Sequence, residues 1–223
     1  MIYDRFQKEA IEHINQGYSV IVSAPTGAGK TAIAEYVIED CIKNDRGVIY
    51  TAPIKALSNQ KFRDFQSQFP DKVGILTGDV SLNKNAPVLV MTTEIFRNKL
   101  LDQSQDLKKY SWIIFDEAHY IDNPERGTVW EESFIFLPHH MKTLCLSATI
   151  PNIKEFSEWL ESIHKKPVKI VVEEKRPVPL HFFFQCHNQV VDKIGDLKLL
   201  RNKHPNKLSA LINYINERSG LPC

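Results

Sequence analysis

Two clusters in this chain combine backbone amides, a lysine, hydroxyls and carboxylates in patterns that suit phosphate and metal chemistry. The first is a glycine-rich turn after an apolar run, and it comprises Ala24, Pro25, Thr26, Gly27, Ala28, Gly29, Lys30 and Thr31. Its glycines let backbone N–H groups turn inward around phosphate oxygens, and a helix that starts there points its positive end at the same anion. Ala24 replaces the first glycine of the strict phosphate-loop pattern. We expect Lys30 to reach the β- and γ-phosphates of a nucleotide and Thr31 to ligate Mg²⁺.

The second cluster is Asp116-Glu117-Ala118-His119, which directly follows another apolar run. A carboxylate at a strand end beside a phosphate loop can hold Mg²⁺, so we expect Asp116 to be a metal ligand, usually through water. The neighbouring Glu117 can orient and deprotonate an attacking water. Two acids at a strand end would alone indicate a solvated turn, but the upstream phosphate loop favours a catalytic role. A kinase would need an acceptor pocket instead, and the sequence indicates none.

Six apolar runs position these clusters and four others, because each run stops at a short polar or glycine-rich stretch. They occupy residues 20–22, 48–50, 73–76, 88–91, 112–115 and 143–146. Continuous runs of this length, rich in β-branched residues, predict buried strands of a parallel sheet. Ligands of such sheets gather at the carboxyl ends of the strands. We therefore expect all six polar stretches to meet at one edge of one sheet.

Helical patterns alternate with these strands and predict an α/β fold with right-handed crossovers. The expected helices span residues 4–15, 30–43, 56–69, 93–101, 128–136 and 153–163, and a further strand spans 167–172. The last helix begins at Asn152 with Glu155 three residues on, which resembles a capping box.

A change of composition near residue 175 divides the chain into an α/β domain with the phosphate loop over residues 1–174 and a second segment over residues 175–223. The second segment opens with two prolines, which favour extended backbone. A strand is expected at the aromatic run 181–184 and an amphipathic helix at about 207–218. We interpret this segment as a proline-rich strand, a linker and a helix that lead toward a second domain.

The composition is that of an ordinary globular protein, with 43% hydrophobic and 25% charged residues and a formal net charge of +1. A globally basic nucleic-acid binder is therefore excluded, and any such contact must be local. The chain shows no signal-peptide pattern and no apolar stretch of membrane-spanning length. Its four cysteines are irregularly spaced and are interpreted as reduced thiols of a cytoplasmic protein, or a nuclear one in a eukaryote.

Together the motifs resemble the first RecA-like lobe of superfamily-two helicases, and most closely the Ski-like DExH-box RNA helicases. The resemblance rests on the phosphate loop and the DEAH box described above, and on Pro53-Ile-Lys55-Ala56-Leu57-Ser58-Asn59-Gln60-Lys61, Thr77-Gly78-Asp79, Thr92-Thr93-Glu94, Ser147-Ala148-Thr149 and Arg176-Pro177-Val178-Pro179-Leu180. Glu125-Arg126-Gly127 followed by Trp130-Glu131-Glu132 is the most subgroup-specific match. The resemblance implies a RecA-like P-loop NTPase domain, a mostly parallel sheet with helices on both faces.

The resemblance also implies roles for individual residues. Gln7 would hydrogen-bond adenine, and Ser147 and Thr149 would couple the nucleotide state to strand separation around Asp116 and His119. A nucleic-acid strand would lie over Pro53, Lys55, Ala56, Thr77, Gly78, Thr92 and Thr93. Phosphate contacts there fix position without reading sequence.

A glutamate and an arginine beside this strand path need separate interpretations. Glu94 would repel phosphate, so we assign it to helix capping or to holding Arg97. Arg97 is either a nucleic-acid contact or part of a solvated helix face.

The implied cofactors are ATP and Mg²⁺, and the implied partners are single-stranded nucleic acid, with RNA favoured over DNA, a second RecA-like lobe and possible membership of a larger complex. No match to the second lobe's glutamine- and arginine-rich motif occurs, so we expect these 223 residues to bind nucleotide but to hydrolyse it slowly. Three alternatives stay open: a repair-type DNA helicase, a nucleotide-gated clamp that binds without separating strands, and a duplex translocase of the restriction type.

Overall fold

The computed structural model describes residues 2–102, 105–148, 150 and 152–176, and the backbone of 184–186 and 189–191. The chain divides into two compact units, Met1–Pro177 and Val178–Cys223. In the second unit, strands β9 (Phe184–Cys186) and β10 (Gln189–Val191) pair antiparallel. The helix expected over 207–218 lies outside the described residues, as does the strand expected over 181–184 apart from residue 184.

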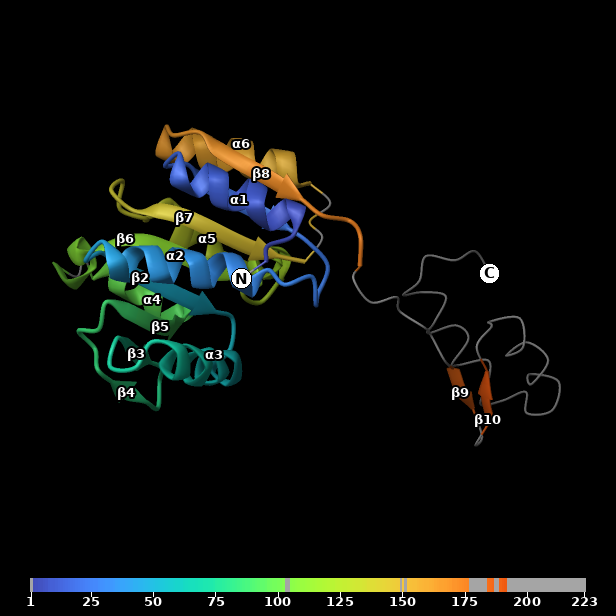
Figure 1. Cartoon of the computed structure of the whole chain (residues 1–223), viewed down its shortest axis with the longest axis horizontal. Coiled ribbons are helices and arrows are strands. Elements are labelled where there is room, and N and C mark those ends of the chain that lie inside the picture. The colour runs from blue at the N-terminus through green and yellow to red at the C-terminus, as the bar shows by residue number, and fades with distance from the viewer. Residues whose placement is uncertain are drawn as a thin grey trace. The chain divides into compact units, whose positions relative to one another are not determined.

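One eight-stranded sheet forms the centre of the first unit (Figure 1). The strands are β1 Ser19–Ser23, β2 Gly47–Ala52, β3 Val73–Leu76, β4 Ser81–Leu82, β5 Val88–Thr92, β6 Tyr110–Asp116, β7 Lys142–Ser147 and β8 Val168–Val172. Their order is β4-β3-β5-β2-β6-β7-β1-β8, and every pairing is parallel except that of β4 with β3. The seven predicted strands are confirmed. Strand β4 was not predicted, because its two residues are exposed and form no apolar run.

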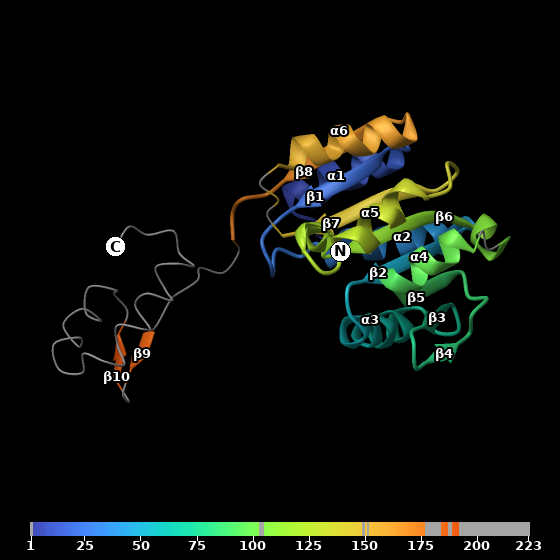
Figure 2. The same ribbon diagram turned by 180° about the vertical axis from the view of Figure 1, so that it is seen from behind.

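Six α-helices cover both faces of this sheet, as expected. They are α1 Arg5–Asn15, α2 Thr31–Lys43, α3 Lys55–Gln68, α4 Thr93–Leu101, α5 Gly127–Ile135 and α6 Ile153–His164, with short 3-10 helices η1 Gln105–Lys109 and η2 Ala118–Asp122. Helices α1, α2 and α3 lie in front of the sheet in Figure 1, and α4, α5 and α6 lie in front of it in Figure 2. The predicted helix bounds agree to within one residue.

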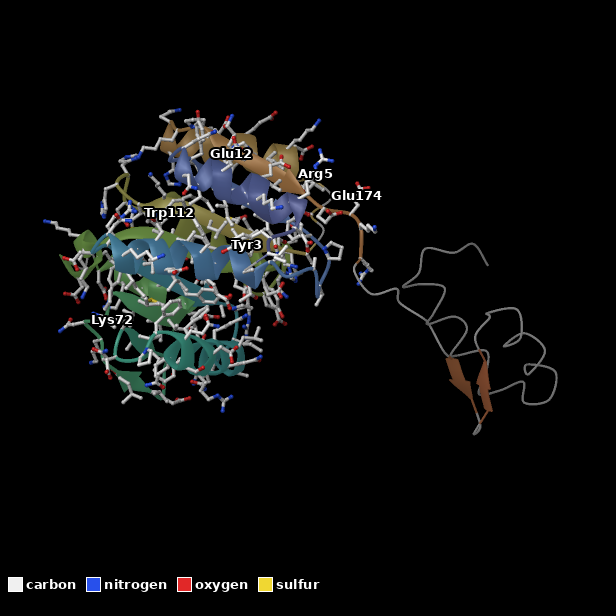
Figure 3. All side chains as sticks on the ribbon, in the orientation of Figure 1. Tyr3, Arg5, Glu12, Lys72, Trp112 and Glu174 are labelled. Carbon is white, nitrogen blue, oxygen red and sulfur yellow. The ribbon has the colours of Figure 1, made fainter. Side chains whose placement is uncertain are left out.

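Each face of the sheet carries its own buried core. The core under α1, α2 and α3 includes Phe65 and Trp112, which is labelled in Figure 3. The core under α4, α5 and α6 includes Phe96, Phe134 and Phe156. Neighbouring residues of one strand alternate between these cores, and this two-sided burial is the reason for continuous apolar runs in the sequence.

The capping box expected at Asn152 is wrong. Asn152 makes no side-chain capping hydrogen bond in the described part of the chain, and its backbone (φ −108°, ψ 39°) is not the extended conformation that such caps adopt. A reciprocal cap occurs instead at α1, where the Asp4 N–H donates to Gln7 Oε1 at 2.8 Å. That bond orients Gln7 next to the phosphate loop.

Candidate functional site

The order of the strands sorts the predicted site residues into two adjacent halves of one sheet edge. Strands β6, β7 and β1 are neighbours, and the DEAH box, Ser147 and the phosphate loop lie at their carboxyl ends, with Asp116 and Ser147 as the last residues of β6 and β7. Strands β3, β5 and β2 are also neighbours, and the residues expected to bind nucleic acid follow these three. We call the two groups the nucleotide half and the groove half. The boundary between them runs between β2 and β6.

The phosphate loop has the backbone that its glycines permit. Gly27 (φ +84°) and Gly29 (φ +87°) both adopt left-handed conformations, and the loop turns through an Ala28 N–H bond to the Pro25 carbonyl at 3.1 Å. A Cβ on Gly29 would lie 2.8 Å from Gln7 Nε2, whereas a Cβ on Gly27 would meet nothing. Gly29 is therefore required for its φ, and a methyl group there would also displace the Gln7 amide.

Lys30 is folded onto the carbonyl groups of its own loop. Lys30 is only 9% exposed, and its Nζ donates to the Ala24 carbonyl at 2.6 Å and to the Pro25 carbonyl at 3.2 Å. Burial lowers the pKa of Lys30, and the nearby Glu117 and Asp116 carboxylates oppose that shift. An anion in the loop would stabilise the buried ammonium, so the site has the charge that a phosphate needs.

The two DEAH carboxylates are held differently. The Tyr50 hydroxyl donates to Asp116 Oδ2 at 2.5 Å, and the Glu117 N–H donates to Asp116 Oδ1 at 3.1 Å. Burial and the Asp116 charge raise the pKa of Tyr50 well above its ordinary value, so Tyr50 stays protonated and acts as the donor. Both Asp116 oxygens thus have fixed partners, which orients the carboxylate.

Glu117 occupies a strained conformation for a residue with a side chain. Its backbone is left-handed (φ 57°, ψ 45°), where it serves as the N-terminal residue of η2. Non-glycine residues in this region cost about 1–2 kcal/mol and occur often at functional sites. Its Oε2 lies 3.3 Å from His119 Nδ1. The turn therefore places the Glu117 carboxylate beside His119, whereas the Asp116 carboxylate bonds Tyr50.

The residues predicted to ligate magnesium suit that ion. Thr31 and Asp116 offer only oxygen atoms, which Mg²⁺ prefers, and Mg²⁺ commonly completes its shell with water and substrate phosphates. Within the described residues no three His, Cys, Asp or Glu side chains form a self-sufficient metal cluster. The ammonium group of Lys61 contacts Thr31, the expected magnesium ligand: Lys61 Nζ donates to Thr31 Oγ1 at 3.0 Å. The donor set therefore fits a metal held jointly with a nucleotide.

Gln7 is buried rather than solvated. Its Oε1 accepts from the Asp4 N–H, and its Nε2 donates to the Gly29 carbonyl at 2.9 Å. The amide thus connects α1 to the phosphate loop. Its predicted contact with adenine stays a prediction.

Ser147 lies at the phosphate loop, whereas Thr149 lies outside the described residues. The Ser147 carbonyl accepts from the Ala24 N–H at 3.1 Å, and its buried Oγ has no hydrogen-bond partner among the described residues. Sequence reasoning missed Ser23, whose hydroxyl accepts from the Ile150 N–H at 3.4 Å and bonds the Ala148 carbonyl at 3.3 Å. Ser23 thereby attaches the segment after β7 to the strand that carries the phosphate loop.

The groove half contains a cavity of about 510 Å³. It is lined by Pro53, Ile54, Lys55, Ala56, Gly78, Thr92, Glu94, Ile95 and Arg126. Five of the seven residues expected to bind nucleic acid are in this set. The other two, Thr77 and Thr93, are buried, and their hydroxyls bond the Val80 N–H at 3.2 Å and the Ala52 carbonyl at 3.4 Å.

Charges along the groove are paired in a way the sequence did not indicate. Lys55 Nζ contacts Asp79 Oδ2 at 2.6 Å on the surface. Of the two roles expected for Glu94, holding Arg97 is wrong, because Glu94 faces Arg126 at 3.7 Å and Arg97 pairs with Glu132 at 3.5 Å. The cause is helix α5, which packs against α4 and supplies the closer partner for Arg97. Glu94 does lie in the first turn of α4, where a carboxylate favours the helix start. Arg97 does not line the groove cavity.

Comparison with known proteins establishes the class to which this fold and site belong. The family model for the DEAD/DEAH box helicase matches residues 4–156. The chain belongs to the DEAD/DEAH box helicase family, and the RecA-like fold inferred from its motifs is confirmed.

Several curated relatives align with most of this chain. It is 51% identical over 182 residues to the DExH-box ATP-dependent RNA helicase DExH9 of Arabidopsis thaliana. The aligned segment covers 81% of this chain and 18% of that protein. It is 47% identical over 202 residues to the human exosome RNA helicase MTR4 (88% and 19%), and 47% identical over 193 residues to the antiviral helicase SKI2 of Saccharomyces cerevisiae (86% and 15%). The chain therefore spans less than a fifth of these relatives.

A solved structure supports the fold alone. The DUF1998 helicase MrfA bound to DNA superposes with a TM-score of 0.63 at 18% identity, covering 77% of this chain and 27% of that one. Among the described residues, no helix is both long and apolar enough to cross a membrane.

Proposed function

We propose that this domain is the ATP-binding lobe of an ATP-dependent RNA helicase and couples Mg-ATP hydrolysis to movement along a single strand. The observation that carries the proposal is the division of one sheet edge into a nucleotide half and a groove half on adjoining strands. Family membership and the similarity to RNA helicases support the same reading. The RNA preference, the second lobe and a place in a larger complex are part of this proposal. The proposal also places the protein in the nucleus or the cytoplasm.

The residues of the nucleotide half divide the work of in-line phosphoryl transfer to water. Lys30 exchanges its two carbonyl partners for the β- and γ-phosphates, and the loop amides bind the remaining oxygens. Thr31 and Asp116 would hold a magnesium ion, which would supply positive charge to neutralise the phosphates. Glu117 orients the attacking water and accepts its proton.

Catalysis of this kind consists mainly of positioning and charge stabilisation, and an arginine finger contributes roughly a thousandfold or more. The helicase family supplies such arginines from a second lobe. We therefore expect the present chain to bind Mg-ATP and to turn it over slowly by itself.

Gln7 is proposed to give preference for adenine. Its amide has a donor and an acceptor, which match the adenine edge. Each of these atoms makes one bond to the protein, to the Asp4 N–H and the Gly29 carbonyl, and the amide keeps one acceptor site and one N–H for adenine. Ser147, whose buried hydroxyl is available beside the loop, is proposed with Thr149 to couple nucleotide state to strand movement.

The test is ATPase activity of the full-length protein without nucleic acid, with single-stranded RNA and with single-stranded DNA. Stimulation by RNA well above DNA supports the proposal, and equal or greater stimulation by DNA indicates a repair-type helicase instead. Absence of stimulation by either indicates a clamp or a partner-dependent machine. Calorimetry with Lys30→Ala tests the nucleotide half separately, since unchanged Mg-ATP affinity would contradict the loop assignment.

A further inference from the structure

The segment Glu125-Arg126-Gly127 is the most subgroup-specific motif of the chain, and the proposed function gives it no role. Two residues separate it from the end of η2, whose first residues belong to the DEAH box. Asn123 Oδ1 accepts from the N–H groups of Glu125 at 3.0 Å and of Arg126 at 3.1 Å. Gly127 starts α5 so close to η2 that a Cβ would lie 2.5 Å from the Ile121 carbonyl. The backbone that carries Arg126 is therefore fixed on both sides.

Arg126 crosses from the nucleotide half into the groove half. Its Nη1 donates to the Pro53 carbonyl at 2.7 Å and lies 3.7 Å from Glu94 Oε1. Pro53 precedes α3 and Glu94 lies in the first turn of α4, so the guanidinium lies between the starts of two helices. Both helix starts present unsatisfied N–H groups, which favour an anion. The guanidinium and the two helix starts favour a negative charge at this position, and the Glu94 carboxylate supplies it in this structure.

Most of the hydrogen-bonding capacity of Arg126 is unused among the described residues. A guanidinium has five N–H donors, and one of them makes the Pro53 bond. The Glu94 contact is too long for a hydrogen bond. The side chain is 41% exposed and lines the cavity of about 510 Å³ together with Lys55. A phosphate group could accept from two of the remaining donors, the geometry in which arginine binds phosphate most strongly.

We propose that Arg126 is a phosphate-binding residue of this groove, where it holds the backbone of a single strand opposite Lys55. The inference rests on the proposed function, because it takes the groove as a nucleic-acid path. Arg126 would replace its loose contact with Glu94 by a phosphate while keeping its bond to Pro53. Such a contact contributes affinity without reading sequence.

The experiment measures the affinity of full-length protein for single-stranded RNA by fluorescence anisotropy over a range of salt concentrations. Arg126→Gln should weaken binding about tenfold at low salt and make the plot of log affinity against log salt less steep by about 0.7. Arg126→Lys should retain the salt slope and weaken binding less, because lysine keeps the positive charge but cannot donate two parallel hydrogen bonds to one phosphate. Arg63→Gln, which removes the same charge from an exposed position of α3 outside the groove lining, is the matched control and should keep the slope.

Lys55→Gln separates failure of this inference from failure of the proposed function. If Lys55→Gln lowers the salt slope and Arg126→Gln does not, the groove stands and the Arg126 inference is overturned. If neither variant changes the slope, the nucleic-acid path itself is wrong. A drop in melting temperature with an unchanged slope would show that the Pro53 bond is merely structural.

Glu94→Gln gives a second measurement that does not depend on removing Arg126. It frees the guanidinium from a competing carboxylate and removes a negative charge from the groove. RNA binding should tighten by about threefold, with a steeper salt dependence. Weaker or unchanged binding would overturn the inference.

Discussion

Replacing Tyr50 with phenylalanine removes one hydroxyl and leaves the packing of a fully buried ring in place. That hydroxyl donates to Asp116 Oδ2 at 2.5 Å, and hydrogen bonds to charged groups contribute about 1.5–3 kcal/mol. Asp116 is half-buried and recovers part of the bond from water, so we expect a loss of about 1–2 kcal/mol. In a domain of this size the melting temperature should fall by about 3–6 °C.

The same bond orients the carboxylate that is proposed to hold magnesium. If the whole loss appears in the transition state, kcat/KM for RNA-stimulated ATP hydrolysis by the full-length protein falls about 5- to 30-fold. The matched control is Tyr110→Phe, which removes a buried hydroxyl that donates to the Ala86 carbonyl at 3.2 Å, away from the site. Tyr110→Phe should lower stability by about 1 kcal/mol and leave kcat/KM unchanged.

The reasoning would be refuted by Tyr50→Phe retaining both its melting temperature and its kcat/KM. It would also be refuted if Tyr110→Phe reduced hydrolysis as strongly as Tyr50→Phe, since the effect would then come from general destabilisation. Titration of hydrolysis with Mg²⁺ gives a further check, because a misoriented Asp116 should raise the concentration required for half-maximal rate.

Three other perturbations give sharp outcomes. Gly27→Ala and Gly29→Ala should each weaken Mg-ATP binding in calorimetry about 5- to 30-fold, because a Cβ at a left-handed φ costs about 1–2 kcal/mol, and Gly29→Ala should weaken it further because the new methyl group displaces the Gln7 amide; a smaller loss for Gly29→Ala than for Gly27→Ala would contradict this contact. Lys61→Met removes a cation from Thr31 Oγ1, so the Mg²⁺ concentration that half-saturates binding of a fluorescent nucleotide should fall about threefold, and a rise would show that Lys61 aids the site instead. Burial raises the pKa of Cys41 to about 11 and the pKa of the Cys145 thiol further, so both thiols are protonated at pH 8 and should resist alkylation, measured by mass spectrometry, until the domain unfolds; rapid labelling of either one would contradict its burial.

Much of the fold is readable from the sequence because its strands are buried on both faces. Residues 112–115 are a continuous apolar run and residues 143–146 are apolar apart from Thr143, and each run is followed at once by residues that can do chemistry. Such runs end where the strand leaves the core, which marks both the strand and the edge of the sheet. The bounds of the helices were predicted to within one residue because polar and glycine residues lie at the helix ends.

The contacts that link the two halves of the site could not be predicted, because they depend on strand order. Tyr50 and Asp116 are 66 residues apart in the chain, and Arg126 and Pro53 are 73 apart. They meet only because β2 lies beside β6, an adjacency that no local pattern specifies. The left-handed backbone of Glu117 could not be predicted for another reason, since no sequence pattern indicates that conformation for a glutamate. Strand β4 was missed because two exposed residues carry no hydrophobic period.

The two-sided burial of the central strands also determines where this domain can move. Packed interiors switch between discrete arrangements and do not bend continuously, so β5, β2, β6, β7 and β1 should keep one shape whichever ligand is present. In amide hydrogen exchange, these strands should exchange slowest with and without nucleotide, while protection changes in residues 24–31 and 116–126. The sheet then sets a constant spacing between the two proposed ligand sites, and relative motion of those sites is left to the loops at its edge and to any domain that docks against them.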